Sequence, residues 1–339
     1  MIRVFTDTAA NLPPEVLEKY HIRTLPLTYR VDGELPEGEF DGPAYYDAIR
    51  GGAEVKTAMV NPQDTAEGME PVLAAGDDLL YIGISGGISG TCWSVGLAAD
   101  ELMAKYPGRQ LRVIDSRGAS LGEGLIPIEV AKRAQAGATM EELVECVRSM
   151  RSRMQQFFVV DDLKYLHKGG RISGGAKLAG TILNIKPILQ GDEEGKIILR
   201  SKVRGKNRAI EELANLYAQF CNDPTQTIGL AHADCPADML RLHSLLREKG
   251  HTGEILTVCY EPVTGSHVGP ARWRCFSWAK RGAEQRNKTA QTGAKALFST
   301  EKTPSRRSFL RKYDKRRQIV LTELSIKKRK SLDKLAENR

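Results

Sequence analysis

The alternation of apolar runs and amphipathic stretches predicts strands separated by helices over the first part of the chain. Leu79–Ile84 is a mostly apolar run, as expected for a strand buried on both faces. A loop of serines and glycines follows over Ser85–Thr91, and Trp93, Leu97 and Leu102 then recur at helical spacing. The rest of the fold is interpreted around this strand, loop and helix.

The same patterns predict further elements on both sides of this unit. The other expected strands are Arg3–Thr6, Thr24–Val31, Leu111–Ile114, Ile185–Leu189, Ile197–Leu199, Thr227–Leu230 and Glu254–Val258. The other expected helices are Glu15–Tyr20, Gly42–Arg50, one opened by Asn61 and Pro62, Gly118–Ala136, one opened by the capping box at Thr139 and continued to Met154, Asn207–Cys221 and Pro236–Lys249.

Strands that alternate with helices of this length predict a mostly parallel sheet with helices on both faces. The expected fold class is α/β with two domains, an N-terminal parallel-sheet domain over residues 1–157 and a smaller α+β domain over residues 158–276. Residues 277–339 form a separate basic tail in this interpretation.

Three polar loops follow strands directly, at Asp7-Thr8, Ser85–Thr91 and Asp115-Ser116. Ligands bind beyond the carboxyl ends of the strands in open parallel sheets, so these loops are expected to converge on one site. Free backbone N–H groups and hydroxyls at the start of a helix favour an anion, either a phosphate or a carboxylate. A tight turn that merely needs small residues is the alternative interpretation of the glycine-rich loop.

Composition narrows the class of protein. Hydrophobic residues make up 41% of the chain, and no apolar run approaches the ~18 residues of a membrane span. Six scattered cysteines without a CxxC pair indicate reduced thiols in a cytoplasm. The net charge is +8, of which residues 271–339 contribute +15, so residues 1–270 carry −7 and offer no basic surface for nucleic acid.

Several side chains are candidates for chemistry. Ser85 or Ser89 could act as a nucleophile, but the chain has no G-x-S-x-G elbow around them. His232 and Cys235 are a possible metal pair that lacks a third ligand. His267, in a small-residue loop over Thr264–Gly269, is equally compatible with a functional and a solvent-exposed position.

The motifs taken together resemble the DegV family over about residues 1–270. The resemblance is carried by Asp7–Leu12, Ile84–Thr91, Asp115-Ser116 with Ser120, Gly122 and Gly124, Leu163–Ser173, Ile185–Leu189, Lys202–Gly205 and Ser266–Pro270. It implies a bacterial cytoplasmic protein, not itself an enzyme, that binds one palmitate-like long-chain fatty acid between its two domains and needs no metal or other cofactor.

The resemblance also implies which residues hold the ligand. The carboxylate is expected at Thr57 and Ser89, with Ser85, Gly90 and His267 beside it. Arg171 and Arg204, whose forked donors suit carboxylate or phosphate, match positions near the carboxylate end or on the face that meets a partner. That partner is a separate kinase that makes acyl-phosphate, or the protein serves lipid transport.

Two positions depart from the family pattern near the expected carboxylate site. Ala58 stands where a serine usually follows the threonine, and Ser85-Gly86 replaces a pair of serines. After Pro270 the family's usual Gly-Ala-Leu run is absent, and a single lost base would explain the sequence that follows. Residues 271–339 are therefore either a tail read in a shifted frame or a real basic extension. We therefore expect the terminal strand of the second domain to be missing, disorder over Arg281–Thr303, and a frayed helix over Ser308–Leu335.

Two other classes of function stay open at this stage. One is an enzyme that acts on a phosphorylated metabolite through the Ser85–Thr91 loop, which would need a base or metal cluster there. The other is a nucleic-acid-binding protein that uses the basic tail, for example Lys327–Lys330.

Overall fold

The computed structural model describes residues 1–172, 184–270 and 273–278 of the 339-residue chain. The expected disorder and helix in the tail lie outside these residues. The described elements, in chain order, are β1 (Ile2–Asp7), η1 (Thr8–Ala10), α1 (Pro14–Tyr20), β2 (Arg23–Leu25), β3 (Thr28–Val31), α2 (Gly42–Arg50), β4 (Val55–Ala58), α3 (Pro62–Ala74), β5 (Asp78–Gly83), α4 (Thr91–Lys105), β6 (Leu111–Asp115), α5 (Leu121–Gln135), α6 (Met140–Arg151), β7 (Met154–Val159), α7 (Lys164–Lys168), β8 (Ile185–Gly191), β9 (Ile197–Arg204), α9 (Lys206–Phe220), β10 (Ile228–His232), α10 (Pro236–Glu248), β11 (Ile255–Cys259), α11 (Pro262–Val268) and β12 (Trp273–Trp278).

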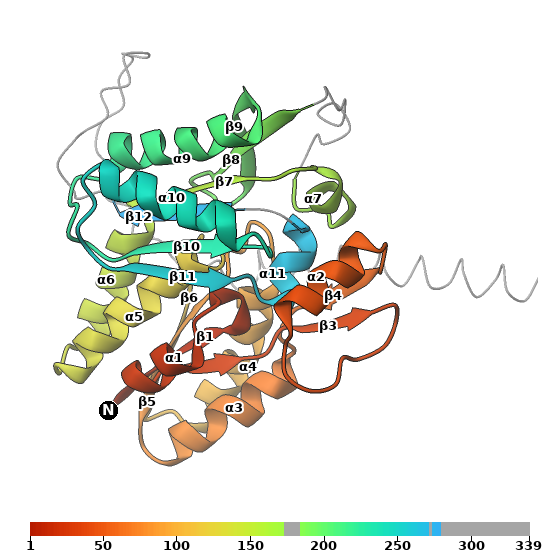
Figure 1. Cartoon of the computed structure of the whole chain (residues 1–339). Helices are drawn as coiled ribbons and strands as arrows, with labels where there is room; N and C mark the ends of the chain where they lie inside the picture. The colour runs from red at the N-terminus through yellow and green to blue at the C-terminus, as the bar shows by residue number, and fades with distance from the viewer. Residues whose placement is uncertain (173–183, 271–272, 279–339) are drawn as a thin grey trace, which may run out of the picture. The chain divides into compact units, whose positions relative to one another are not determined.

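The first half, residues 1–151, is built on a four-stranded sheet in the order β2-β1-β5-β6 (Figure 1). All neighbouring strands in this sheet are parallel. One face packs against α3 and α4 through residues such as Met69, Leu73 and Val95, and the other packs against α5 through Leu121 and Leu125. The predicted parallel sheet with helices on both faces is confirmed.

The second half, residues 154–278, is built on a mixed six-stranded sheet in the order β11-β10-β12-β7-β8-β9. β10 and β11 are parallel, and the other neighbouring pairs are antiparallel. Helices α9 and α10 cover one face, where Leu213 and Leu242 are fully buried (Figure 1). The α/β class with an additional α+β part therefore agrees with the prediction.

Helix α5 also packs against the second sheet, so it lies in contact with both halves. A Cβ on Gly229 of β10 would come within 2.6 Å of the Cβ of Leu121. Because only glycine permits this approach, the helix and the strand can pack directly on one another. Residue 157, where the domain boundary was expected, lies in β7, which pairs within the second sheet.

Several parts of the structure differ from the sequence predictions. The expected strand Thr24–Val31 is split at Pro26, which lacks the N–H group that a continuous ladder needs, into β2 and β3. Strand β4 was not predicted. Met154 does not continue the preceding helix, because α6 ends at Arg151 and Met154 begins β7.

A further difference concerns the terminal strand, which was expected to be missing. Instead, residues Trp273–Trp278 form β12, which lies between β10 and β7 and pairs antiparallel with both. The six backbone positions therefore occupy the interior of the sheet, and the expected open edge is wrong. A shifted reading frame was expected to remove this strand, and the structure does not show that effect.

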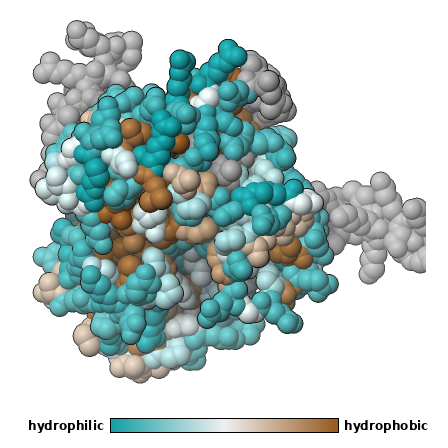
Figure 2. Space-filling view, in the orientation of Figure 1, coloured by the Kyte–Doolittle hydropathy of each residue, from teal (hydrophilic) through white to brown (hydrophobic). Residues whose placement is uncertain are grey.

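The surface in this view is mainly hydrophilic, and hydrophobic residues gather over the region of α10 and β11 (Figure 2). Leu240 of α10 is among the exposed large hydrophobic residues, with 70% of its surface accessible. Among the described helices, none combines the length and apolar character needed to cross a bilayer.

Candidate ligand-binding site

A mainly apolar cavity of about 160 Å³ lies between residues of the two halves. A single buried water needs only ~10–15 Å³, so the space suits a larger guest. The lining residues come from the carboxyl edge of the first sheet, from β4, from α7 and β9, and from α11. They are Leu27, Thr57, Ala58, Met59, Ile84, Ile88, Ser89, Gly90, Ala119, Leu166, Arg171, Ile197, Val263, Thr264, His267 and Val268.

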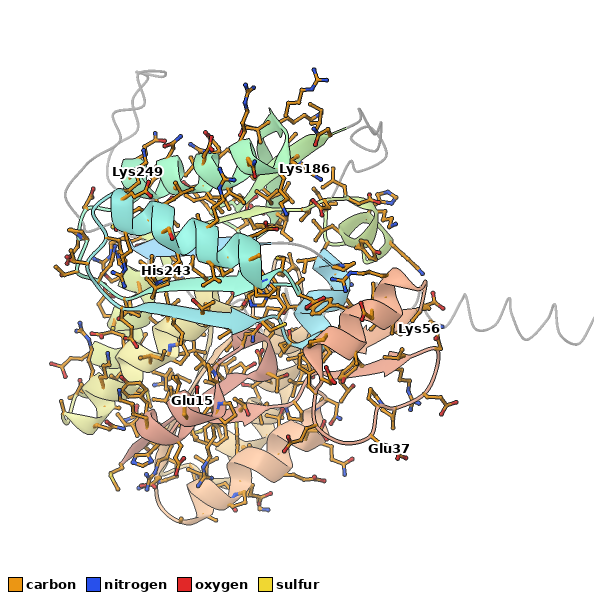
Figure 3. The ribbon with its side chains drawn as sticks, in the orientation of Figure 1. Glu15, Glu37, Lys56, Lys186, His243 and Lys249 are labelled. Carbon is orange, nitrogen blue, oxygen red and sulfur yellow. The ribbon has the colours of Figure 1, made fainter. Side chains whose placement is uncertain are left out.

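Thr57 reaches the cavity because β4 alternates its side chains between two faces. Val55 and Thr57 are partly buried, whereas Lys56 and Ala58 are more exposed. Figure 3 shows Lys56 at the surface, and its side chain is 73% exposed. The hydroxyl of Thr57 lies 3.0 Å from Nε2 of His267, so these two polar groups form a pair at the cavity wall.

His267 lies on helix α11, and not in the loop expected over Thr264–Gly269. Pro262 begins the helix, and the side chain of Glu261 accepts hydrogen bonds from the N–H groups of Val263 and Thr264, both at 2.6 Å. The helical spacing of Thr264, His267 and Val268 brings all three to the cavity. The expected loop is therefore wrong for most of its length.

The imidazole of His267 is neutral at physiological pH. Burial, together with the nearby Arg171 cation, lowers the pKa of His267 from 6.5 to about 4. A neutral imidazole has one nitrogen that donates and one that accepts a hydrogen bond. One nitrogen of His267 can therefore form the hydrogen bond with Thr57, as donor or as acceptor. The other nitrogen has the opposite role and can bond to a second partner.

Ser89 and Gly90 belong to the glycine-rich loop and both line the cavity. The carbonyl of Ser85 accepts hydrogen bonds from the N–H groups of Ile88 (3.1 Å) and Ser89 (3.0 Å), which curls the loop into the start of α4. The Ser89 hydroxyl lies 2.9 Å from that of Thr91. A Cβ on Gly90 would lie 2.7 Å from the sulfur of Met59, so glycine lets the segment after β4 approach the loop.

Ser85 is placed differently from Ser89. Its side chain is 1% exposed and does not line the cavity. The Ser85 hydroxyl donates a hydrogen bond to the carbonyl of Gly195, 2.8 Å away, in the turn between β8 and β9. The same oxygen accepts from the N–H group of Gly87 at 3.1 Å.

The two arginines named from the sequence lie in different places. Arg171 lines the cavity, its Nε donates to the carbonyl of Ile88 at 3.1 Å, and its guanidinium also donates to the carbonyl of Gly169. Burial lowers the pKa of Arg171, which nonetheless stays charged. Arg204 lies at the end of β9, exposed and away from the cavity lining.

The three strand-end loops meet at one edge of the parallel sheet, because β1, β5 and β6 are neighbours, but of the three predicted segments only Ser85–Thr91 lines the cavity. Asp7 accepts hydrogen bonds from the Tyr81 hydroxyl (2.7 Å) and the Ile84 N–H group (3.0 Å). Asp115 accepts from the N–H group of Gly86 at 3.0 Å. These carboxylates hold the glycine-rich loop from beneath and do not line the cavity.

A second buried carboxyl accompanies Asp7 and was missed by the sequence analysis. Glu123 of α5 is fully buried and accepts a hydrogen bond from the Thr6 hydroxyl at 2.9 Å. Burial and the neighbouring Asp7 raise the pKa of Glu123 well above its ordinary value, and burial raises the pKa of Asp7 to about 6. An acidic residue inside the otherwise apolar stretch of α5 was the available signal.

Within the described part of the chain, no group of three His, Cys, Asp or Glu residues is arranged to hold a metal ion. Nδ1 of His232 accepts a hydrogen bond from the backbone N–H group of Cys235 at 3.4 Å. The His232 and Cys235 pair therefore forms a local turn contact.

The sequence profile of the DegV family matches residues 1–277 of this chain. The match extends past residue 270, where the resemblance was expected to end, and includes most of β12. A DegV domain-containing protein of Clostridium perfringens is 32% identical over 271 residues, which cover 78% of this chain and 93% of that protein.

Solved structures have the same fold. A DegV family protein from Thermus thermophilus, described by its fatty acid binding, aligns with a TM-score of 0.74 and 26% identity, over 82% of this chain and 99% of that one. A fatty-acid-binding DegV family protein from Streptococcus agalactiae aligns with a TM-score of 0.74 and 25% identity, over 83% and 99% of the two chains.

Proposed function

This chain belongs to the DegV family, and from that premise we propose that it binds one long-chain fatty acid in the cavity between its halves. The observation that carries the proposal is the meeting of Thr57, Ser89 and His267 at one cavity. These three polar residues come from β4, the glycine-rich loop and α11, and apolar side chains form most of the remaining lining. A polar end beside an apolar space matches a carboxylate with an alkyl tail.

The polar residues suit a carboxylate because they supply hydrogen-bond donors without a direct charge clamp. Thr57 and Ser89 offer hydroxyl groups, and His267 is neutral with one N–H donor. Arg171 adds a positive field near His267, while its Nε is occupied by the carbonyl of Ile88. In this arrangement Gly90 gives the carboxylate access to the backbone at the start of α4.

The alkyl tail would supply most of the binding free energy. The cavity of about 160 Å³ is comparable in size with one that holds benzene, so it takes the carboxylate end and the first methylene groups, and it must widen to take the whole tail. Burying all of some fifteen methylene groups at ~0.8 kcal/mol each would then contribute roughly 12 kcal/mol before the costs of association. Those costs are about 4–15 kcal/mol, so useful affinity requires a well-shaped apolar wall. The side chains available for it include Leu27, Ile88, Leu166 and Val263.

The proposal extends to the use of the bound lipid. Hydroxyl and neutral imidazole groups hold a carboxylate less firmly than a buried arginine fork does, which suits a carboxylate that is handed on. We infer that the protein is a carrier and is not itself an enzyme. It either presents the carboxylate to a separate kinase that forms acyl-phosphate or carries the fatty acid in lipid transport. Incubation of the loaded protein with such a kinase and ATP tests this step by the appearance of acyl-phosphate.

The binding proposal is tested by mass spectrometry of the full chain purified from bacterial cells. Native spectra should show an added mass equal to one C14–C18 fatty acid, which denaturing solvent removes. The Thr57→Ala/Ser89→Ala double variant should lose most of this adduct, whereas Ser116→Ala, in a neighbouring loop outside the cavity, should keep it. A folded wild-type protein that takes up no added fatty acid would refute the proposal.

A further inference from the structure

The two halves of the molecule meet at several places, among them Thr57 with His267 in the cavity wall and Gln156, which donates to the Arg117 carbonyl at 3.2 Å. Two further groups of contacts lie beside the cavity. The first, which we call the tyrosine seam, joins α2 and Asn11, the residue after η1, to the segment around Tyr260 and α11. The Tyr45 hydroxyl donates to the carbonyl of Pro262 (2.7 Å) and the Tyr46 hydroxyl to that of Tyr260 (3.0 Å). Asn11 adds a side-chain hydrogen bond to the carbonyl of Cys259 at 2.9 Å.

The second contact, which we call the hairpin seam, joins the glycine-rich loop to the turn between β8 and β9. It is centred on the hydrogen bond from the Ser85 hydroxyl to the Gly195 carbonyl, 2.8 Å long and buried. Contact is close here, because a Cβ on Gly87 would lie 2.6 Å from the carbonyl carbon of Gly195. Gly195 itself has φ of +74°, which favours glycine.

Both chain segments that form the hairpin seam continue into the wall of the cavity. Ile88, three residues after Ser85, lines the cavity from the loop, and Ile197, two residues after Gly195, lines it from β9. The carbonyl of Ile88 also accepts the hydrogen bond from Arg171, which lies in the second half. Separation of the turn from the loop would therefore move two walls of the cavity apart.

We propose that the Ser85 hydroxyl is a latch that fastens the β8–β9 turn over the cavity and sets how fast the ligand leaves. This inference rests on the proposed fatty-acid binding. Ser85 is then a positioning residue that acts through Gly195 and does not touch the carboxylate. The tyrosine seam stays closed as the fixed side about which the hairpin seam opens.

The two seams differ in the contacts that would be broken if each one opened, and this difference supports the latch. The hairpin seam depends on the Ser85 and Arg171 hydrogen bonds to backbone carbonyls and on the packing of one partly buried side chain, Ile88, against an apolar cluster of the second half. The tyrosine seam combines several hydrogen bonds with two large, buried rings, Tyr45 and Tyr46. Local opening takes place where the fewest buried contacts are broken, so the hairpin seam opens first.

The test compares ligand release from four forms of the full chain by stopped-flow fluorescence, with cis-parinaric acid as the probe. Ser85→Ala removes the latch from the loop side. Gly195→Ala disturbs it from the turn side, because the added Cβ would lie 2.0 Å from the Ser85 oxygen. The matched control is Ser116→Ala, which removes an equally buried hydroxyl that binds the Gly118 N–H group within the first half.

We expect the probe to leave Ser85→Ala and Gly195→Ala about two- to tenfold faster than it leaves the wild type. This range corresponds to the net free energy of one hydrogen bond. Ser116→Ala should release the probe within about twofold of the wild-type rate. Amide hydrogen exchange on the ligand-free chain supplies a second reading, with faster exchange at Gly195 and Lys196 in the Ser85→Ala variant.

Equal release rates in the wild type and both latch variants would overturn the latch, as would faster exchange without faster release. A wild-type chain that does not bind the probe would instead refute the proposed function. The exchange comparison needs no ligand, so the two failures are distinguishable. If Ser85→Ala fails to fold, Gly195→Ala still gives the release comparison from the opposite side of the seam.

Discussion

The tyrosine seam and the hairpin seam join the same two halves, but they use different physical means. At the tyrosine seam, rings with little exposed surface are locked by hydroxyl-to-carbonyl hydrogen bonds, and the phenol oxygen of Tyr46 would lie 2.2 Å from a Cβ on Gly265. At the hairpin seam, glycines bring two backbones together, and hydrogen bonds from Ser85 and Arg171 hold them there. The comparison indicates that the tyrosine seam stays closed, whereas the hairpin seam opens to let the ligand leave.

The largest expected effect is at the tyrosine seam. Tyr46→Ala removes one of the largest fully buried side chains and should lower the free energy of unfolding by about 3–5 kcal/mol, as other large-to-small aromatic truncations do. Urea denaturation measures this loss. Tyr46→Phe, which removes only the hydroxyl bonded to Tyr260, should lose about 1 kcal/mol. Equal losses in the two variants would show that ring packing does not hold this seam.

Asn11 should have the next largest effect, because it connects the same seam by two hydrogen bonds. Its side chain donates to the Cys259 carbonyl and accepts from the Glu261 N–H group at 3.0 Å, and its φ is +59°. Asn11→Ala should lower the unfolding free energy by about 2–4 kcal/mol through the lost bonds and the strained φ.

Asn11→Gly is the matched control for that substitution, since glycine accepts the positive φ without strain but makes neither bond. It should recover about 1 kcal/mol of the loss in the same urea titration. If Asn11→Ala is as stable as the wild type, the seam does not depend on this bridge.

A smaller effect should appear as pH dependence at His267, which α11 connects to the tyrosine seam. The folded pKa of about 4 lies below the usual 6.5, so the unfolded chain binds more protons between these pH values. The stability contributed by neutral His267 is therefore lost as pH falls from 6.5 towards 4. Relative to His267→Gln, the wild type should lose about 1–3 kcal/mol over this interval.

Two measurements check the His267 prediction. Urea unfolding of both forms between pH 4 and 7 gives the difference in stability, and NMR titration of the imidazole gives the pKa directly. An imidazole that titrates near 6.5 in the ligand-free chain would contradict the buried, neutral histidine.

The smallest expected effect is at Arg204, which lies at neither seam. Arg204→Ala should change the affinity for fatty acid by less than about twofold, as expected for an exposed side chain outside the cavity. Arg171→Gln should weaken the affinity more, because it removes both the positive charge beside His267 and the hydrogen bond to the Ile88 carbonyl. Fluorescence titration with cis-parinaric acid measures both affinities. Equal affinities in the two variants would mean that Arg171 contributes nothing to binding.

The sequence predicted the first sheet well, because its strands are buried runs followed directly by polar loops. The meeting of the loops after β1, β5 and β6 was predicted from the rule for parallel sheets, whereas the order of the strands was not. The missed parts are short or depend on distant contacts. β4 has four residues, and α11 is a seven-residue helix held by Glu261 at its start and by Tyr45 and Tyr46 across the seam.

The site was accessible to sequence analysis only in part. Thr57, Ser89, Gly90, Arg171 and His267 were named through the resemblance, and the structure brings all five to one cavity. Local patterns could not separate Ser85 from Ser89, because both are serines of one loop. Their different roles depend on the Gly195 carbonyl, which arrives from a turn more than a hundred residues away.

The central claim, a fatty acid carboxylate held at Thr57, Ser89 and His267, is tested most directly by ¹³C NMR of [1-¹³C]palmitate bound to the full chain. We predict one carboxyl resonance, shifted from that of the free acid in buffer, that moves in Thr57→Ala and Ser89→Ala but keeps its position in Ser116→Ala. A bound resonance that keeps the same position in all four proteins would contradict the claim.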